Sequence, residues 1–85
     1  MYIVVQHQIS DPSTFWGTAQ EALGNLPAGV RIIESFPNAD GSKATCLWEA
    51  DSVETLRNYI DSQVGQVSRN EYYEVAAEKA FGLPG

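Results

Sequence analysis

Two hydrophobic periodicities alternate along the chain and predict four strands and two helices. Segments rich in β-branched and aromatic residues are typical of strands. Segments with an apolar side chain at every third or fourth position are typical of amphipathic helices. The expected strands cover residues 2–9, 30–36, 43–50 and 71–76, and the expected helices lie between Asp11 and Leu26 and between Asp51 and Gly65. We expect an irregular tail from about residue 77.

The unit from Lys43 to Gly65 predicts a strand, a capped turn and a helix in direct succession. Asp51 is expected to cap the start of the helix, with Glu54 three residues later at the spacing of a capping box. Gly65 stands where a left-handed C-terminal cap is expected. This unit fixes how one strand passes into one helix, and the other elements are arranged around it.

The resulting order, β-α-β-β-α-β, predicts the fold class. It is the split arrangement of an α+β, ferredoxin-like fold, in which a four-stranded antiparallel sheet carries two helices on one face. A chain of 85 residues forms a single domain. A domain of this size buries only about 60–65 % of its unfolded surface, so its core is marginal on its own.

Both faces of the expected sheet carry large apolar side chains, which predicts a homodimer. In the strand of residues 43–50, Trp48 lies on one face and Leu47 on the other. In the strand of residues 30–36, Ile32 and Phe36 are expected to oppose Ile33. Leaving Trp48 or Leu47 in water would forgo about 1.5–3 kcal/mol each. A second copy whose sheet stacks on the open face would cover them.

The segment Cys46-Leu47-Trp48-Glu49-Ala50, followed by an acidic helix start, resembles the strand-helix segment of small members of the dimeric α/β-barrel proteins. The resemblance covers nearly the whole chain in its layout and implies a homodimer. That superfamily includes cofactor-free monooxygenases, polyketide cyclases, muconolactone-type isomerases, haem-processing enzymes, stress-response proteins and a nickel-binding branch. The resemblance therefore implies a fold and an assembly but leaves several functions open.

Charge and composition exclude some classes of partner. The net charge is −6, which disfavours nucleic acid and anionic membrane surfaces. The single cysteine excludes an intramolecular disulfide. The apolar run near residues 2–5 is far shorter than the roughly 20 residues of a membrane span. These features predict a cytoplasmic protein that partners neither nucleic acid nor membrane.

His7 is the only histidine and the candidate catalytic residue. Its ordinary pKa permits both acid and base roles near neutral pH, so we expect proton transfer at this side chain. The alternative is a structural histidine at a strand end, hydrogen-bonded to Gln6, Gln8 or solvent. Because His7 shares its row with Ile3 and Val5, a second alternative is that this row faces the helices.

Aromatic side chains predict a pocket for an apolar or aromatic small molecule. The expected ligand-binding residues are Trp48, Tyr2 and Phe36, with His7 or Gln6 as the polar point. Core and dimer packing is the alternative role of such residues. No organic cofactor is expected.

His7 and Cys46 also form a candidate pair of metal ligands, which a carboxylate such as Glu34 or Glu49 would complete. The alternative for Cys46 is a small buried hydrophobic residue.

Three functions therefore remain open from the sequence. The first is binding of a small, largely apolar molecule between sheet and helices, with His7 transferring protons as in an isomerase, a cyclase or a cofactor-free monooxygenase. The second is a metal- or ligand-binding sensor or stress protein that is not an enzyme and uses His7 and Cys46. The third is a structural module for self-association.

Overall fold

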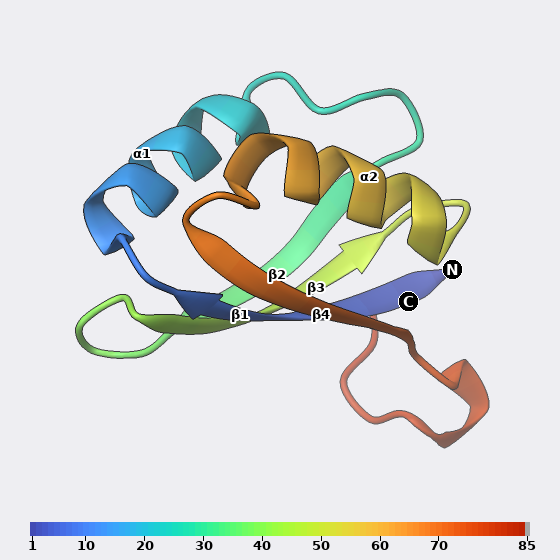
Figure 1. Cartoon of the computed structure of the whole chain (residues 1–85). Helices are drawn as coiled ribbons and strands as arrows, with labels where there is room; N and C mark the ends of the chain where they lie inside the picture. The colour runs from blue at the N-terminus through green and yellow to red at the C-terminus, as the bar shows by residue number, and fades with distance from the viewer. Residues whose placement is uncertain (85) are drawn as a thin grey trace.

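A computed structural model describes residues 1–84 and confirms the expected α+β, ferredoxin-like topology (Figure 1). The four strands form one antiparallel sheet in the order β2-β3-β1-β4. Both helices lie on the same face of this sheet. The elements are β1 (Tyr2–Ile9), α1 (Pro12–Leu23), β2 (Arg31–Pro37), β3 (Lys43–Glu49), α2 (Val53–Val64), β4 (Ser68–Glu74) and a 3₁₀ turn (Ala77–Lys79).

Alternation along the central strand β1 separates two rows of side chains. The inner row is Ile3, Val5, His7 and Ile9, and all four residues are buried beneath the helices. The outer row faces away from the helices and is partly or fully exposed. His7 therefore belongs to the row that packs against the helices, which is one of the two placements left open by its shared row with Ile3 and Val5.

The core forms between this inner row and the apolar faces of the helices. Leu56, Ile60 and Val64 repeat along α2 and are buried, which confirms the expected face of that helix. From α1, Phe15 is buried. That helix ends at Leu23, three residues before the expected end, because Gly24 forms its cap and the chain then turns toward β2.

The caps of α2 differ from the expected ones. Ser52, and not Asp51, is the N-cap: its extended backbone lets Oγ accept the Thr55 amide at 3.0 Å. The capping contact joins Ser52 and Thr55, so it lies one position later than the predicted pair of Asp51 and Glu54. Gly65 has a φ of −61°, so the helix ends in a right-handed conformation and the expected left-handed cap is wrong.

A bulge in β2 reverses the expected side of Phe36. The pairing with β3 shifts between Ile32 and Glu34, so Ile33 is the additional residue. Beyond it Ser35 pairs with Cys46 and Phe36 pairs with Thr45. Phe36 consequently lies on the outer face and is 63 % exposed, whereas strict alternation had assigned it to the row of Ile32.

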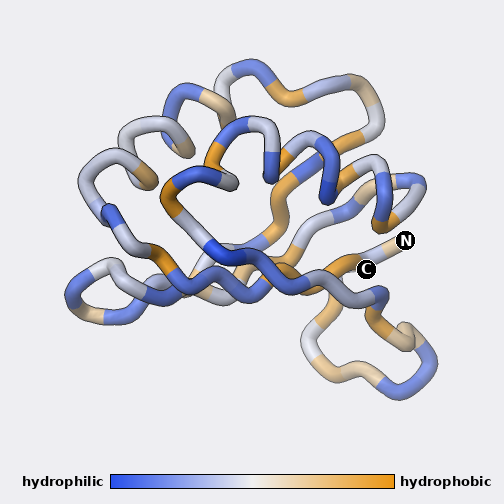
Figure 2. Tube along the Cα trace, in the orientation of Figure 1, coloured by the Kyte–Doolittle hydropathy of each residue, from blue (hydrophilic) through white to orange (hydrophobic). Residues whose placement is uncertain are grey.

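The last strand begins earlier than predicted, at Ser68 and not at residue 71, and ends at Glu74. Its first residues are polar and pair with β1 through the backbone, from Ser68 opposite Ile9. Figure 2 shows this edge strand as mainly hydrophilic, so hydropathy did not reveal it. The tail beyond it contains the short 3₁₀ turn and runs back below the open face of the sheet (Figure 1). Gly85, its last residue, lies outside the described residues.

The turn between β2 and β3 depends on Gly41, which leads to a first prediction. Gly41 has a φ of +76°, and an added Cβ would lie 2.9 Å from Nε1 of Trp16. Gly29 has a φ of +81° but no atom within 4 Å of such a Cβ. We expect Gly29→Ala to lower the free energy of unfolding by about 1 kcal/mol through backbone strain, and Gly41→Ala by about 2 kcal/mol or more. Urea denaturation of both variants measures the difference, and equal losses would contradict the role of the Trp16 contact.

Candidate functional site

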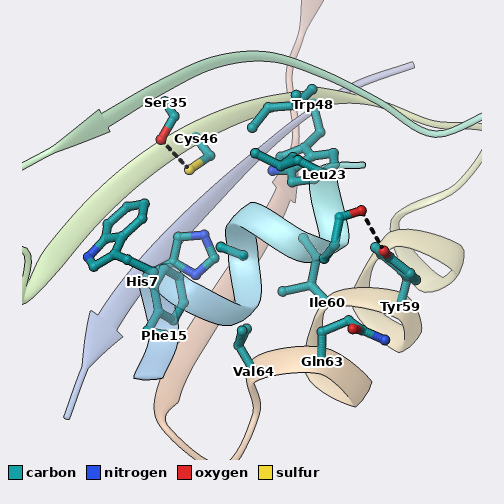
Figure 3. A pocket seen from close by; sticks show the side chains of 14 residues that line it. His7, Phe15, Leu23, Ser35, Cys46, Trp48, Tyr59, Ile60, Gln63 and Val64 are labelled. Atoms are coloured by element: carbon teal, nitrogen blue, oxygen red, sulfur yellow. Dashed lines mark hydrogen bonds between the residues drawn. The ribbon is translucent and has the colours of Figure 1, made fainter. Parts of the chain in front are cut away.

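A small cavity lies between the sheet and the helices (Figure 3). Its volume is about 60 Å³, and its wall is almost entirely apolar. None of the described residues around it is a lysine, an arginine, an aspartate or a glutamate. The lining residues are His7, Phe15, Trp16, Ala19, Ala22, Leu23, Ile32, Ser35, Cys46, Trp48, Tyr59, Ile60, Gln63 and Val64.

His7 is the titratable base in this wall. Strand β1 directs it inward, and only 5 % of the residue is exposed. Its ring packs edge-on against Phe15, with the ring centroids 5.2 Å apart. Its Nδ1 lies 2.5 Å from Oδ1 of Asn70, which is its neighbour on β4. One nitrogen of the ring is thereby held, and no hydrogen bond forms at Nε2 within the described part of the chain.

The surroundings of Asn70 define which tautomer of His7 is present. The amide nitrogen of Asn70 lies 3.0 Å from Oδ1 of Asp61 on α2. A carboxylate only accepts hydrogen bonds, so the NH₂ group of Asn70 faces Asp61 and its oxygen faces His7. Tyr72 also donates to Asp61, at 2.6 Å, and helps to hold that carboxylate. His7 therefore carries its proton on Nδ1, and Nε2 is a free acceptor.

Burial keeps the His7 ring neutral. Desolvation lowers the pKa of His7 below its ordinary value of 6.5, and this effect exceeds the opposing effects of the Asn70 hydrogen bond and of the Asp61 charge. At neutral pH the imidazole is therefore uncharged. A neutral imidazole with a free Nε2 is the form that accepts a proton.

Cys46 lies in the same wall as a thiol. Its Sγ donates to Oγ of Ser35 at 3.4 Å, and burial raises the pKa of the thiol. The thiolate that binds metal or attacks an electrophile is therefore disfavoured. His7 and Cys46 share the cavity, but in residues 1–84 no group of three or more histidine, cysteine, aspartate or glutamate side chains gathers around a common point. Glu34 lies on the outer face and does not complete the pair.

Trp48 contributes an unpaired donor. Trp48 lies on β3 opposite Ile3 of β1, and only 6 % of the residue is exposed. Its indole Nε1 is buried and has no hydrogen-bond partner among residues 1–84. The other tryptophan differs, because Nε1 of Trp16 donates to the carbonyl of Gly41 at 2.9 Å. A buried N–H group without a partner is costly.

The sheet separates the expected ligand-binding residues into two groups. Trp48 and His7 line the cavity under the helices. Tyr2 and Gln6 belong to the outer row of β1, and Phe36 lies on the same outer face. The structure does not bring these five residues into one pocket. Alternation already indicated the separation for β1, whereas the bulge that moves Phe36 gave no signal in the sequence.

Neither Asn70 nor Asp61 is among the site residues predicted from the sequence. Asn70 lies just before the strand expected over residues 71–76, and Asp61 lies in the helix expected between Asp51 and Gly65. Only their contacts in the folded chain reveal them. Strand β4 places Asn70 opposite His7, and α2 brings Asp61 within hydrogen-bond distance of Asn70. That relation depends on where β4 begins, which the hydropathy pattern did not define.

A second hollow lies on the outer face of the sheet. Its volume is about 330 Å³, within the range of sites for small ligands. Val4, Leu47 and Tyr73 form its floor, and the C-terminal tail from Val75 to Leu83 borders it. Tyr73 is 54 % exposed, and Phe81 in the tail is fully exposed.

No model of a known protein family, no curated protein and no solved structure matches the chain. Across residues 1–84, none of the helices has the length and apolar character that crossing a membrane requires.

Proposed function

We propose that the chain binds a small, uncharged molecule in the cavity beneath the helices and that His7 accepts a proton from it. One observation carries the proposal: the only histidine is buried in an apolar cavity, with Nδ1 engaged by Asn70 and Nε2 free. A histidine with a purely structural role is usually hydrogen-bonded at its polar atoms or exposed to solvent. Here β1, Phe15 of α1 and Asn70 of β4 together orient the ring.

The size and charge of the cavity limit the ligand. A cavity of about 150 Å³ holds benzene, and 60 Å³ is smaller, so only a compact molecule or a compact end of a longer one fits. An ion would lose its hydration without gaining a charged partner from the wall. A flat aromatic ligand, as the sequence suggested, would require the helices to move. Proton transfer, as in an isomerase, is the activity that this arrangement supports best.

Histidine NMR tests this function with two probes of similar size. In protein labelled with ¹⁵N-histidine, we expect propan-2-ol to shift the Nε2 resonance of His7, because its hydroxyl donates to that nitrogen. Xenon fills apolar cavities without donating a hydrogen bond, so it should perturb Phe15 and Ile60 more than Nε2. A resonance of His7 that neither probe moves would contradict the proposal. His7→Gln, which removes the resonance, assigns it.

We also propose that two copies pair through their open sheet faces, as the resemblance to dimeric α/β-barrel proteins implies. Val4, Leu47 and Tyr73 support this proposal because they lie together on that face. Phe36 and Phe81 add exposed aromatic surface beside them. Exposed apolar patches of this kind are typical of association surfaces.

Leu47→Glu tests the homodimer. A buried carboxylate at the centre of each stacked sheet would face its copy, so we expect the variant to be monomeric at concentrations at which the parent chain is dimeric. Sedimentation velocity gives the mass of both proteins. Gln20→Glu, an exposed change on α1 with the same added charge, should leave the dimer intact. A parent chain that sediments as a monomer would overturn the assembly but not the cavity.

A further inference from the structure

Asn70 lies between the buried imidazole and the surface of the molecule. Its side-chain oxygen lies 2.5 Å from Nδ1 of His7, and its side-chain nitrogen lies 3.0 Å from Oδ1 of Asp61. Asp61 belongs to α2 and is exposed, whereas His7 on β1 is buried. Two consecutive hydrogen bonds therefore connect an exposed carboxylate on the helix to the ring on the central strand.

Of the described side chains that contact the Asn70 amide, only Asp61 can decide its orientation. Imidazole adapts, because Nδ1 of His7 donates in one neutral tautomer and accepts in the other. The hydroxyl of Ser68 also adapts. It lies 2.9 Å from Oδ1 of Asn70 and 3.0 Å from the carbonyl oxygen of Val64, so it can donate to either oxygen, and in the second case it can accept from a flipped amide. The carboxylate of Asp61 only accepts.

We propose that Asp61 is a positioning residue that acts through Asn70 to keep the proton of neutral His7 on Nδ1 and to leave Nε2 as the proton acceptor. This inference rests on the proposed function and identifies the group that selects its base. Without the carboxylate, the Asn70 amide loses its reason to prefer one orientation. A flipped amide presents its NH₂ group to Nδ1, which must then accept, so the proton of the ring moves to Nε2.

The same carboxylate favours the charged form that proton transfer creates. When a ligand proton moves to Nε2, the bonding electron pair stays with the ligand and His7 becomes an imidazolium. Its Nδ1 keeps the hydrogen bond to Asn70 throughout. The negative charge of Asp61 acts to raise the pKa of His7, against the larger effect of burial. The return of the proton from Nε2 restores the neutral ring, so no further reactant is needed.

Tyr72 holds the Asp61 carboxylate in the orientation that this role requires. Its hydroxyl donates to the same Oδ1 at 2.6 Å, and the guanidinium of Arg57 lies 5.3 Å from the centroid of its ring. Burial and the hydrogen bond to Asp61 raise the pKa of Tyr72, so its hydroxyl remains a donor at neutral pH. The carboxylate is therefore fixed although it is exposed.

Nitrogen NMR of the ligand-free protein tests the positioning role. His7 is the only histidine, and in protein labelled with ¹⁵N-histidine the chemical shifts of the ring nitrogens show which one carries the proton. At about pH 8 we expect a protonated Nδ1 and an unprotonated Nε2 in the parent chain. Asp61→Ala should increase the ratio of the Nε2–H to the Nδ1–H tautomer by about tenfold or more. Glu54→Ala, which removes a carboxylate from the first turn of the same helix, should change neither shift.

The double variant Asp61→Ala/Asn70→Asp separates positioning from a loss of structure. A carboxylate at residue 70 can only accept, so it should restore the Nδ1–H tautomer of His7 in the absence of Asp61. The spectrum is recorded above the pKa of His7 in the variant, because the new charge raises that pKa. A double variant that keeps the tautomer ratio of Asp61→Ala would overturn the role of the amide orientation.

The outcomes separate this inference from the function on which it rests. If propan-2-ol shifts Nε2 of His7 in the parent chain but Asp61→Ala leaves the tautomer unchanged, the function stands and the role of Asp61 is overturned. If Asp61→Ala changes the tautomer but propan-2-ol does not shift Nε2, the positioning role stands and the function is overturned. A protonated Nε2 in the neutral ring of the parent chain would overturn both.

Discussion

Replacing Leu56 by alanine is expected to lower the free energy of unfolding by about 3–5 kcal/mol. Leu56 lies on the inner face of α2 with no exposed surface, packed with Ile60 in the core. Truncation removes buried carbon atoms and leaves a void that a close-packed interior fills only in part. A domain of this length has a total stability of only about 4–13 kcal/mol, so the loss is a large fraction of it.

Leu23→Ala is the matched control, because it makes the same change within a helix at a position that is 43 % exposed. We expect it to change the unfolding free energy by less than about 1 kcal/mol, since little apolar surface returns to water and alanine favours the helix. Urea denaturation followed by circular dichroism measures both variants. Similar losses at the two positions would show that α2 does not bury Leu56 as described.

The second large effect concerns pH and His7. Burial lowers the pKa of His7 in the folded chain below the value of 6.5 that it has when unfolded. Between these two values the unfolded chain binds more protons than the folded one. The free energy of unfolding therefore falls as the pH drops below about 6.5, with a slope of at most about 1.4 kcal/mol per pH unit for this one group. Well above pH 6.5 the group binds a proton in neither state, so its contribution to the slope disappears.

His7→Gln removes the titration and should flatten the stability profile just below pH 6.5. Of the groups near His7, the Asp61 carboxylate opposes the lowering of the His7 pKa, and Cys46, whose own pKa is raised by burial, stays a neutral thiol in this window. Hydrogen bonds from Thr14 and Ser42 lower the pKa of Asp11 and Asp40, so these carboxyl groups act at a more acidic pH. Urea denaturation at several pH values gives both profiles. Parallel profiles would mean that His7 is solvated in the folded chain.

The sequence allowed the fold to be predicted because hydrophobic periodicity and topology agree. Strand β1 matched its expected residues, and the alternation correctly placed His7 in one row with Ile3 and Val5, although it left open which face that row occupies. The apolar repeat of α2 was equally informative. These features depend on which side chains are buried, and the spacing of apolar residues in a single sequence indicates that directly.

The details that failed depend on geometry that hydropathy does not record. Asp51 and Ser52 are both good N-caps, and the exact phase of the helix decides between them. The extra residue at Ile33 leaves no mark in composition, yet it moves Phe36 to the other face. Asn70 is an unremarkable polar residue until the pairing of β4 brings it to His7.

The bulge at Ile33 lies on β2, which is one of the two edge strands of the sheet, and β4 is the other. Unpaired backbone groups along an edge invite other chains to add strands without limit. On β2 the extra residue interrupts the ladder, and Pro37 lacks an amide donor at its end. On β4 the charged side chains of Arg69, Glu71 and Glu74 make the other edge unfavourable for strand addition. Growth at the edges would have no natural end, so these features of the two edges work against a fibre.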